Sequence, residues 1–499
     1  MRTFVKKIVP PVLYLNEQLI HIGQSLAGIV PELFLALFLL IYLIAELLLH
    51  RYVNKDIMGR ILFITTLAGA VLALGFVLGQ WGETPGFRFH SMLFLDNIAV
   101  FFKLLVIGAW IFTLLHIRIV DYDFPTELNA LLIAATLGLC LLCMATHWLS
   151  VYIALELVSV SSYLLVALSP SKKAAEGSLK YLLFGAISSA IMLYGISLIY
   201  GLTGTLDFTD PAMRFELARK VPFVMYTAIF MTFGGILFKL SLVPFHVWAP
   251  DVYEATPTPL VSFLSVAPKA AVLLVLMRAV SALPTELLPL LGGIALISII
   301  IGNVAALWQQ NARRLLAYSS IAQAGYLIIG IVAFTALGFE SATFYMAAYL
   351  LLNMGAFLLI DLLRPRSQTI LSEYAGLGKK HIWIASTLTL IMVALAGLPP
   401  TVGFTAKWLV FSALWDSYQA QGQPWLMWLL IVGIINAAIS LAYYLRLPYL
   451  LFFKPALSQP IKPRFPVTVN IIVGTLLAAI LLLFFKPEFL MVWIRTMSL

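Results

Sequence analysis

The chain has 499 residues, of which 62% are hydrophobic and 11% are charged, and its mean hydropathy is +1.00. An ordinary soluble domain has about 25% charged residues, so a soluble fold does not fit this composition. A transmembrane β-barrel is disfavoured as well, because its strands alternate polar and apolar residues, whereas the apolar runs here are about twenty residues long, the length of a membrane-spanning helix. The composition therefore predicts an all-α, polytopic membrane protein.

The net charge of +9 does not indicate nucleic-acid binding, because Lys and Arg in a membrane protein lie mostly in loops and set its orientation. The two cysteines, Cys140 and Cys143, form a CxxC pattern inside an apolar run. A metal or redox role would require a second cysteine pair, which the sequence lacks, so we expect both to be packing residues. Pro10 and Pro11 interrupt the basic N-terminal segment, so we expect no cleaved signal peptide.

Taken in chain order, the apolar runs predict about fourteen transmembrane helices joined by loops of at most about twenty residues. The predicted spans are residues 26–49, 59–79, 95–115, 127–145, 148–168, 179–202, 221–242, 258–283, 287–307, 315–334, 341–363, 383–415, 424–452 and 467–493.

The charges in the loops predict how these spans are oriented. Seventeen Lys and Arg lie in loops or at span ends on the side reached after odd-numbered spans, and ten lie in loops, at span ends or in the termini on the opposite side. Because cytoplasmic loops carry the excess of positive charge, we expect both termini to face the periplasm and the loop from Arg364 to Lys380 to face the cytoplasm.

Four basic residues lie neither in loops nor at span ends, and all are lysines: Lys103, Lys239, Lys269 and Lys407. Ionisable groups at membrane depth are costly and point to functional sites. A desolvated lysine, unlike an arginine, can release its proton near neutral pH, so lysines without arginines favour proton handling over anion binding. Lys103 lies seven residues beyond Asp96, near the end of its span, and we expect its side chain to snorkel to the interface.

The other three lysines lie close to residues that break helices. These are Gly234, Gly235 and Pro244 around Lys239, Pro268 beside Lys269, and Pro399, Pro400 and Gly403 before Lys407. Broken helices in the membrane expose backbone groups that only a polar cavity or buried protein can satisfy. The pattern therefore predicts discontinuous helices with a functional lysine on each.

Glu156 is the acidic residue that best matches these lysines, because it lies eight residues into its span without a basic neighbour in the sequence. A buried carboxylate beside a buried lysine forms a pair whose proton occupancy depends on their separation, which is a physical basis for a switch. Glu32, Glu46 and Asp361 lie near the ends of spans, and we expect interfacial roles for them.

A short internal repeat organises the chain. Tyr181 and Tyr349 begin similar segments, and each lies 58 residues before a lysine, Lys239 or Lys407. The repeat predicts two five-helix units, the second inverted because five is odd, as in many transporters. The expected parts are three N-terminal helices (1–126), a first unit of spans four to eight (127–283), an inverted second unit of spans nine to thirteen (284–453) and a C-terminal helix (454–499). Ala324 stands in the second unit at the place of Glu156.

Four segments carry a family resemblance: LKYLLFGAISSAIMLYGISLIYG, FKLSLVPFHVWAPDVYEATPTPLVSFLSVAPKAA, RRLLAYSSIAQAGYLIIG and LAGLPPTVGFTAKW. With them the chain resembles the antiporter-like membrane subunits of respiratory complex I, and among these the subunit N type, the counterpart of mitochondrial subunit 2. Subunits L and M are less similar, since they usually have a His-containing segment where this chain has VAPKAA. Lys103 is not expected from the family pattern.

The resemblance implies a role for each candidate residue. Lys239 would hold a proton with Glu156 as its partner, Lys269 would pass the proton on, and Lys407 would exchange it with one side of the membrane. Tyr326, Ser241 and Ser265 would hold relay waters. His246, at the break after Lys239, would either relay protons or satisfy backbone groups.

The resemblance also implies the setting in which this relay works. Quinone reduction elsewhere in the complex would drive it, and the partners would be other membrane-arm subunits, including sister antiporter-like subunits, in a bacterial inner membrane. We expect no cofactor in this chain, because flavin, iron–sulfur clusters and quinone would bind partner subunits. Two alternatives remain: a subunit of a multisubunit cation/proton antiporter driven by ion gradients, and a spacer subunit that does not pump.

Overall fold

The computed structural model of the chain describes residue 19 and residues 22–52, 54–122, 124–363, 370–455, 465 and 467–497. The N-terminus, the loop residues 364–369, and Lys462 and Arg464, which all entered the orientation prediction, lie outside the described residues. Most of the described chain is helical, and two short strands, β1 (Gly86–Arg88) and β2 (Leu93–Leu95), pair antiparallel between the second and third predicted spans.

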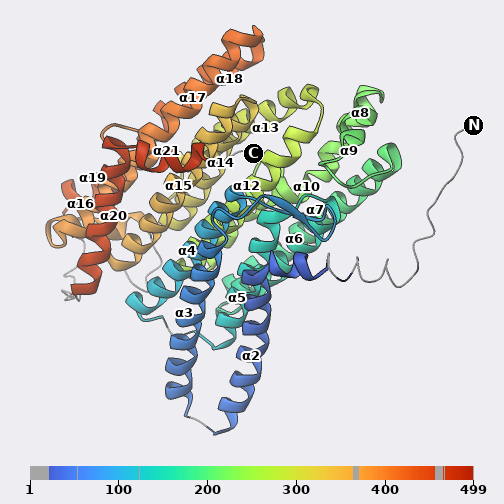
Figure 1. Cartoon of the computed structure of the whole chain (residues 1–499). Coiled ribbons are helices and arrows are strands. Elements are labelled where there is room, and N and C mark those ends of the chain that lie inside the picture. Colours follow the sequence, from blue (N-terminus) through green and yellow to red (C-terminus); the bar gives the residue numbers. More distant parts are fainter. Residues whose placement is uncertain are drawn as a thin grey trace, which may run out of the picture.

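The helices follow one another as in Figure 1. Those of the first half are α2 (Val30–Tyr52), α3 (Lys55–Gly79), α4 (Asn97–Val120), α5 (Glu127–Met144), α6 (Trp148–Ala167), α7 (Lys172–Thr203), α8 (Pro211–Ala218), α9 (Pro222–Thr232), α10 (Gly234–Leu240), α11 (Trp248–Ala255) and α12 (Thr258–Ala282). Those of the second half are α13 (Leu288–Leu307), α14 (Ala312–Val332), α15 (Ala336–Leu363), α16 (Ile382–Ala396), α17 (Val402–Gln421), α18 (Pro424–Tyr444), α19 (Arg446–Phe453), α20 (Val467–Phe485) and α21 (Glu488–Arg495).

Twelve helices of the described part are long and apolar enough to cross a membrane, and a thirteenth span is added when the bent pair α9–α10 is taken as one. The remaining predicted span, residues 383–415, consists of the short apolar helix α16 and of α17, separated by residues 397–401. The predicted all-α, polytopic fold with discontinuous helices is confirmed. The count of fourteen, the two inverted units and their boundaries stay predictions.

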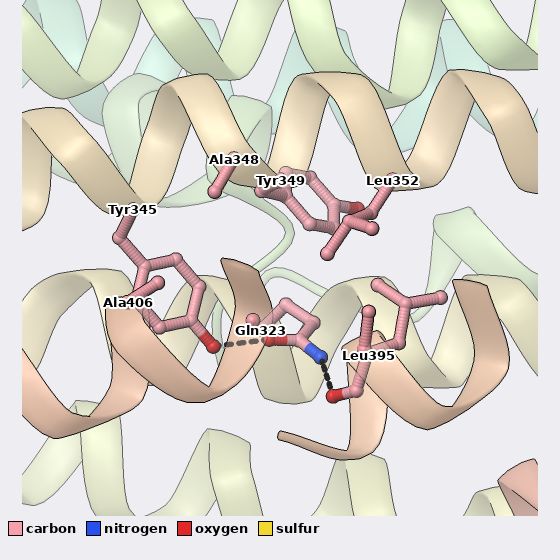
Figure 2. A pocket seen from close by; sticks show the side chains of 9 residues that line it. Gln323, Tyr345, Ala348, Tyr349, Leu352, Leu395 and Ala406 are labelled. Atoms are coloured by element: carbon pink, nitrogen blue, oxygen red, sulfur yellow. Dashed lines mark hydrogen bonds between the residues drawn. The ribbon is translucent and has the colours of Figure 1, made fainter. Parts of the chain in front are cut away.

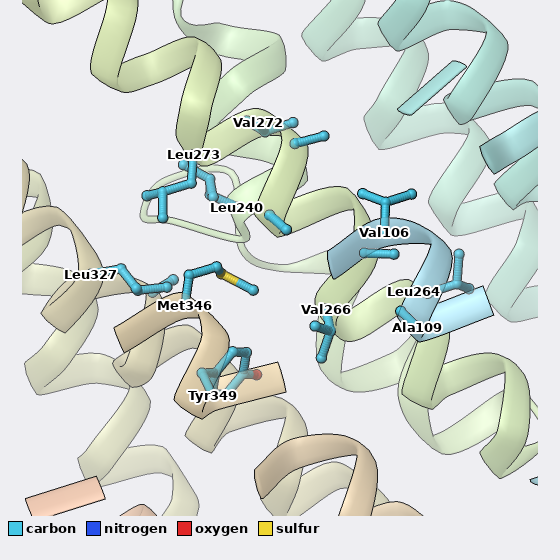
Figure 3. Close-up of a cluster of buried hydrophobic side chains, with 14 of the residues drawn as sticks. Val106, Ala109, Leu240, Leu264, Val266, Val272, Leu273, Leu327, Met346 and Tyr349 are labelled. Carbon is cyan, nitrogen blue, oxygen red and sulfur yellow. The ribbon is translucent and has the colours of Figure 1, made fainter. Parts of the chain in front are cut away.

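Helix α12 occupies the centre of the molecule. Every residue of its apolar stretch is buried inside the protein, and it packs against α4, α5, α10 and α15. Figure 3 shows part of this core, where Val266, Val272 and Leu273 of α12 face Met346 of α15 and Val106 of α4. Whatever α12 carries is therefore removed from lipid and water.

The N-terminal helices are joined through a charged contact that the sequence did not predict. Lys103 on α4 is completely buried, and its Nζ lies 2.6 Å from Oε1 of Glu32 on α2 and donates to Oε1 of Gln80 at 3.1 Å. The prediction that Lys103 snorkels to the interface is wrong, because a carboxylate from another helix compensates its charge within the protein.

The predicted interfacial roles of Glu32 and Asp361 are also wrong. Both side chains are buried, at 2% and 1% exposure, and Asp361 Oδ2 lies 3.1 Å from Nε2 of His116 on α4. A third buried pair joins Arg278 of α12 to Asp96, which caps the first turn of α4, with 2.6 Å between Nη2 and Oδ1. Helix α4 thus contributes one member to each of three buried pairs that connect it to α2, α12 and α15.

Replacing Lys103 tests whether this contact stabilises the N-terminal helices. Lys103→Met leaves the buried Glu32 carboxylate without its cation, so we expect a loss of about 3–5 kcal/mol in stability. Combining it with Glu32→Gln removes the uncompensated charge, and most of the loss should be recovered. Thermal melting of the purified variants in detergent measures the loss and its recovery. A Lys103→Met variant with the same melting temperature as the wild type would contradict the prediction.

Candidate functional site

Lys239 lies on the short helix α10, directly after a bend in the membrane-spanning segment. Helices α9 and α10 meet at Phe233 with an angle of 48°, and α10 ends in Ser241, whose φ of 58° is in the left-handed region. Lys239 is 3% exposed and donates to the hydroxyl of Tyr181 on α7 at 3.3 Å. The bend predicted from Gly234, Gly235 and Pro244 is confirmed.

Aromatic rings rather than a carboxylate surround this lysine. Nζ lies 5.2 Å from the ring centroid of Tyr181, 5.6 Å from that of Tyr163 and 5.9 Å from that of Phe238, distances at which a ring face attracts a cation. Tyr181 is itself held by Trp248, which stacks on it with 4.2 Å between centroids. This cage stabilises a charged amine only weakly compared with an ion pair.

Glu156, the predicted partner of Lys239, does not touch it. Among the described residues no carboxylate lies within 4.0 Å of Lys239 Nζ, and Oε1 of Glu156 is buried without a hydrogen-bond partner. Glu156 lies on α6, which directly precedes α7 in the sequence and packs against it. The two groups are therefore not joined in this structure.

Helix α11, which follows the break after Lys239, is anchored to two other helices by the carboxylate of Asp251. Asp251 accepts hydrogen bonds from Lys180 of α7 at 2.9 Å and from Arg314 of α14 at 2.7 Å. Burial alone would raise the pKa of Asp251, but these two cations outweigh it and hold the pKa below its ordinary value. The anchor therefore ties the first predicted unit to the second beside the site.

Lys269 lies at the middle of α12, immediately after Pro268. Helix α12 runs unbroken from Thr258 to Ala282 through Pro268, so the helix break predicted beside Lys269 is wrong. It is 1% exposed, and Nζ donates to the backbone carbonyl of Ser320 at 2.8 Å and to its hydroxyl at 2.6 Å. The same hydroxyl accepts a hydrogen bond from Tyr349 at 2.8 Å, and the hydroxyl of Tyr253 lies 3.5 Å away. Lys269 is thus bound to α14 by neutral oxygen atoms.

Lys407 lies on α17 just beyond the second helix break. It is 5% exposed, and Nζ donates to the carbonyls of Leu395 at 3.2 Å and Ala396 at 2.8 Å, the last two residues of α16. These carbonyls are free because a helix leaves its final acceptors without intrahelical partners. Gly397 follows with a φ of 88°, and a Cβ there would come within 2.6 Å of the Lys407 side chain, so the site requires glycine.

Of the three residues expected to hold relay waters, only one faces a site lysine. The ring centroid of Tyr326 lies 4.8 Å from Lys407 Nζ. Ser265 instead accepts a hydrogen bond from Asn353 at 2.7 Å, and the buried hydroxyl of Ser241 has no partner among the described residues. His246 is half-buried beside the break, and its Nδ1 is likewise without a described partner.

Sequence reasoning missed the polar residues of α14 and α15 that join the site. Ser320 and Gln323 are one turn apart on α14, and Tyr345 and Tyr349 are one turn apart on α15. Figure 2 shows that Gln323, Tyr345, Tyr349 and Leu395 converge on one small cavity. The recurrence of Ser, Gln and Tyr in the apolar segment LAYSSIAQAGY was the available signal.

No group of His, Cys, Asp and Glu in the described part of the chain could hold a metal ion, and Cys140 and Cys143 are both buried and free. The site is therefore a row of three buried amines, each contacting neutral oxygens or aromatic rings, on helices α10, α12 and α17.

Comparisons with known proteins identify the family of the chain. Residues 145–440 match the family model described as NADH:quinone oxidoreductase/Mrp antiporter, TM. The chain is 36% identical over 450 residues to NADH-quinone oxidoreductase subunit N of Chlorobium chlorochromatii, covering 86% of each protein. It is 37% identical over 442 residues to NAD(P)H-quinone oxidoreductase subunit 2 of Synechococcus elongatus, covering 87% of this chain and 82% of the relative.

Solved structures show the same fold. A chain of respiratory complex I from Thermus thermophilus superimposes with a TM-score of 0.77 at 30% identity, over 92% of this chain and 98% of that one. A chain of the Mrp complex from Dietzia superimposes with a TM-score of 0.76 at 18% identity, which shows a shared fold alone. Because identity above one third extends over most of the length of both proteins, the chain belongs to the subunit N family of NADH-quinone oxidoreductases.

Proposed function

We propose that the chain is a membrane-arm subunit of an NADH:quinone oxidoreductase and moves protons through its buried lysines, coupled to quinone reduction elsewhere in the complex. The observation that carries this proposal is that Lys239, Lys269 and Lys407 are buried without an ion-pair partner among the described residues, whereas Lys103 and Arg278 are paired. Charge at membrane depth that is left uncompensated is expensive, so it is kept where it has a function.

The proposed order of transfer follows the row of helices. Lys239 holds a proton and senses the charge of Glu156 on α6, Lys269 passes the proton across the centre of the molecule on α12, and Lys407 exchanges it with one side of the membrane. Hydroxyls, which can accept or donate, meet Lys239 and Lys269, whereas Lys407 is met by backbone carbonyls, which only accept. Carboxylates in contact would instead hold the lysines permanently charged.

The same proposal defines the partners. The outward faces of α2, α7, α18 and α20 are apolar and largely exposed in the isolated chain. We infer that lipid and other membrane-arm subunits, including sister antiporter-like subunits, cover them. Flavin, iron–sulfur clusters and quinone would bind partner subunits, with no cofactor in this chain. The proposed setting is a bacterial inner membrane with both termini periplasmic.

Replacing Lys239 by arginine tests whether this lysine transfers a proton. Arg keeps the positive charge but does not release its proton in proteins, so Lys239→Arg should assemble and yet lose most pumping and the coupled quinone reductase activity. Lys239→Ala should fail in the same assay. Proton uptake measured beside NADH oxidation in membrane vesicles, with assembly checked on native gels, gives the answer.

The matched control is Lys173→Arg, which makes the same exchange on a side chain that is 74% exposed and should be silent. Full pumping by an assembled Lys239→Arg complex would rule out proton transfer through this residue.

Cysteine labelling tests the proposed orientation. A cysteine introduced at Ser367, in the loop expected to be cytoplasmic, should be protected from a membrane-impermeant reagent in intact cells and react after lysis. Cys140 and Cys143 are completely buried and should not react in either case. Labelling of the Ser367→Cys variant from outside would show that this loop faces the periplasm and would contradict the proposed orientation.

A further inference from the structure

Gln323 on α14 is the centre of a buried hydrogen-bond network between the sites of Lys269 and Lys407. It is 3% exposed, and its Nε2 donates to the carbonyl of Leu395 at 2.9 Å and to the hydroxyl of Tyr444 at 3.0 Å. Its Oε1 accepts a hydrogen bond from Tyr345, and Tyr444 in turn is bonded to Ser319. Both ends of the amide are therefore used, so the side chain has one orientation.

One backbone oxygen joins Gln323 to Lys407. The carbonyl of Leu395 accepts from Gln323 Nε2 at 2.9 Å and from Lys407 Nζ at 3.2 Å. The two nitrogens are consequently no more than about 6 Å apart, which is within the range at which a charge placed on one would act on the other. An amide at this position is neutral and adds no such charge.

A small cavity joins Gln323 to the partner of Lys269. It is lined by Gln323, Tyr345, Tyr349, Leu395 and Ala406 among others, and has a volume of about 10 Å³ open to the centre of a water-sized sphere (Figure 2). That is about the space one water molecule needs. Tyr349, on one wall, donates to the Ser320 hydroxyl that binds Lys269, and Leu395, on the other, accepts from Lys407.

We propose that Gln323 is a positioning residue for proton passage between Lys269 and Lys407. Gln323 holds the carbonyl that anchors Lys407, and it forms the polar wall of a cavity between the two lysines that has room for one water molecule. This inference rests on the proposed function. Tyr349 donates to Ser320 in this structure, so its hydroxyl first turns toward the cavity. Lys269 Nζ then gives a proton to the Ser320 hydroxyl, Ser320 gives its own proton to Tyr349, Tyr349 gives its own to the water, and the water gives one to a neutral Lys407 Nζ. The number of protons is conserved, and Lys269 ends neutral.

The neutrality of the amide is what the proposal requires of residue 323. Gln323→Glu keeps the size of the side chain and the acceptor for Tyr345, but it places a carboxylate within about 6 Å of Lys407. An amine beside an anion holds its proton more tightly, so Lys407 should release its proton less readily. If residue 323 had only a structural role, a charge on its side chain would not shift the pH profile of proton uptake.

The test measures proton uptake and NADH oxidation of assembled complexes between pH 6 and 9. We expect Gln323→Glu to lower proton uptake at neutral pH at least about tenfold and to move the alkaline limb of the profile up by about one pH unit. Gln323→Met, of similar length and without amide groups, should lower the rate several-fold with no shift. The matched control is Gln421→Glu, the same exchange at the exposed end of the helix that carries Lys407.

Wild-type uptake and an unshifted profile for Gln323→Glu would overturn the inference. If Gln323→Glu does not assemble, Gln323→Met decides, and its full activity would overturn the inference as well. Failure of this inference is distinguishable from failure of the proposed function, because Lys239→Arg would then still abolish pumping while both Gln323 variants pump normally.

Discussion

The cost of placing an ammonium group inside a membrane without a carboxylate is the constraint on which the rest of this structure depends. Three lysines meet it with neutral groups: the hydroxyl and rings around Lys239, the serine oxygens around Lys269, and the free carbonyls at the end of α16 around Lys407. The Lys407 site requires a helix to be broken, because an intact helix uses its own carbonyls. The break at residues 397–401 is therefore part of the site rather than an irregularity of the fold, and the bend at Phe233 lies directly before the helix that carries Lys239.

The charges elsewhere in the described protein follow the opposite principle. Lys103, Arg278 and His116 each contact a carboxylate of another helix at 3.1 Å or less, and all three pairs involve α4. A buried pair fixes the position of both groups, which suits a helix that connects the N-terminal part to α12 and α15. Two kinds of buried charge thus coexist, one paired and connecting helices, the other unpaired, which we propose exchanges protons.

Much of the fold was predictable because each span is a long apolar run and each break is marked by Gly or Pro. Lys239, Lys269 and Lys407 were predictable because a charge inside such a run is conspicuous. Lys103 was misjudged because distance to the span end says nothing about a carboxylate on another helix. Gln323 and Ser320 were missed because neutral polar residues are ordinary within membrane helices, and only packing against α15 and α16 gives these two their partners.

The central claim is that Lys269, at the middle of the buried row, carries protons between the two lysines that lie beside helix breaks. The most direct test is the ratio of protons translocated to NADH oxidised by an assembled complex that contains Lys269→Met. Methionine fills the space of the lysine stem without a titratable group. We expect this complex to lose quinone reductase activity or to translocate fewer protons per NADH than the wild type. A wild-type rate together with a wild-type ratio would contradict it and identify the chain as a spacer.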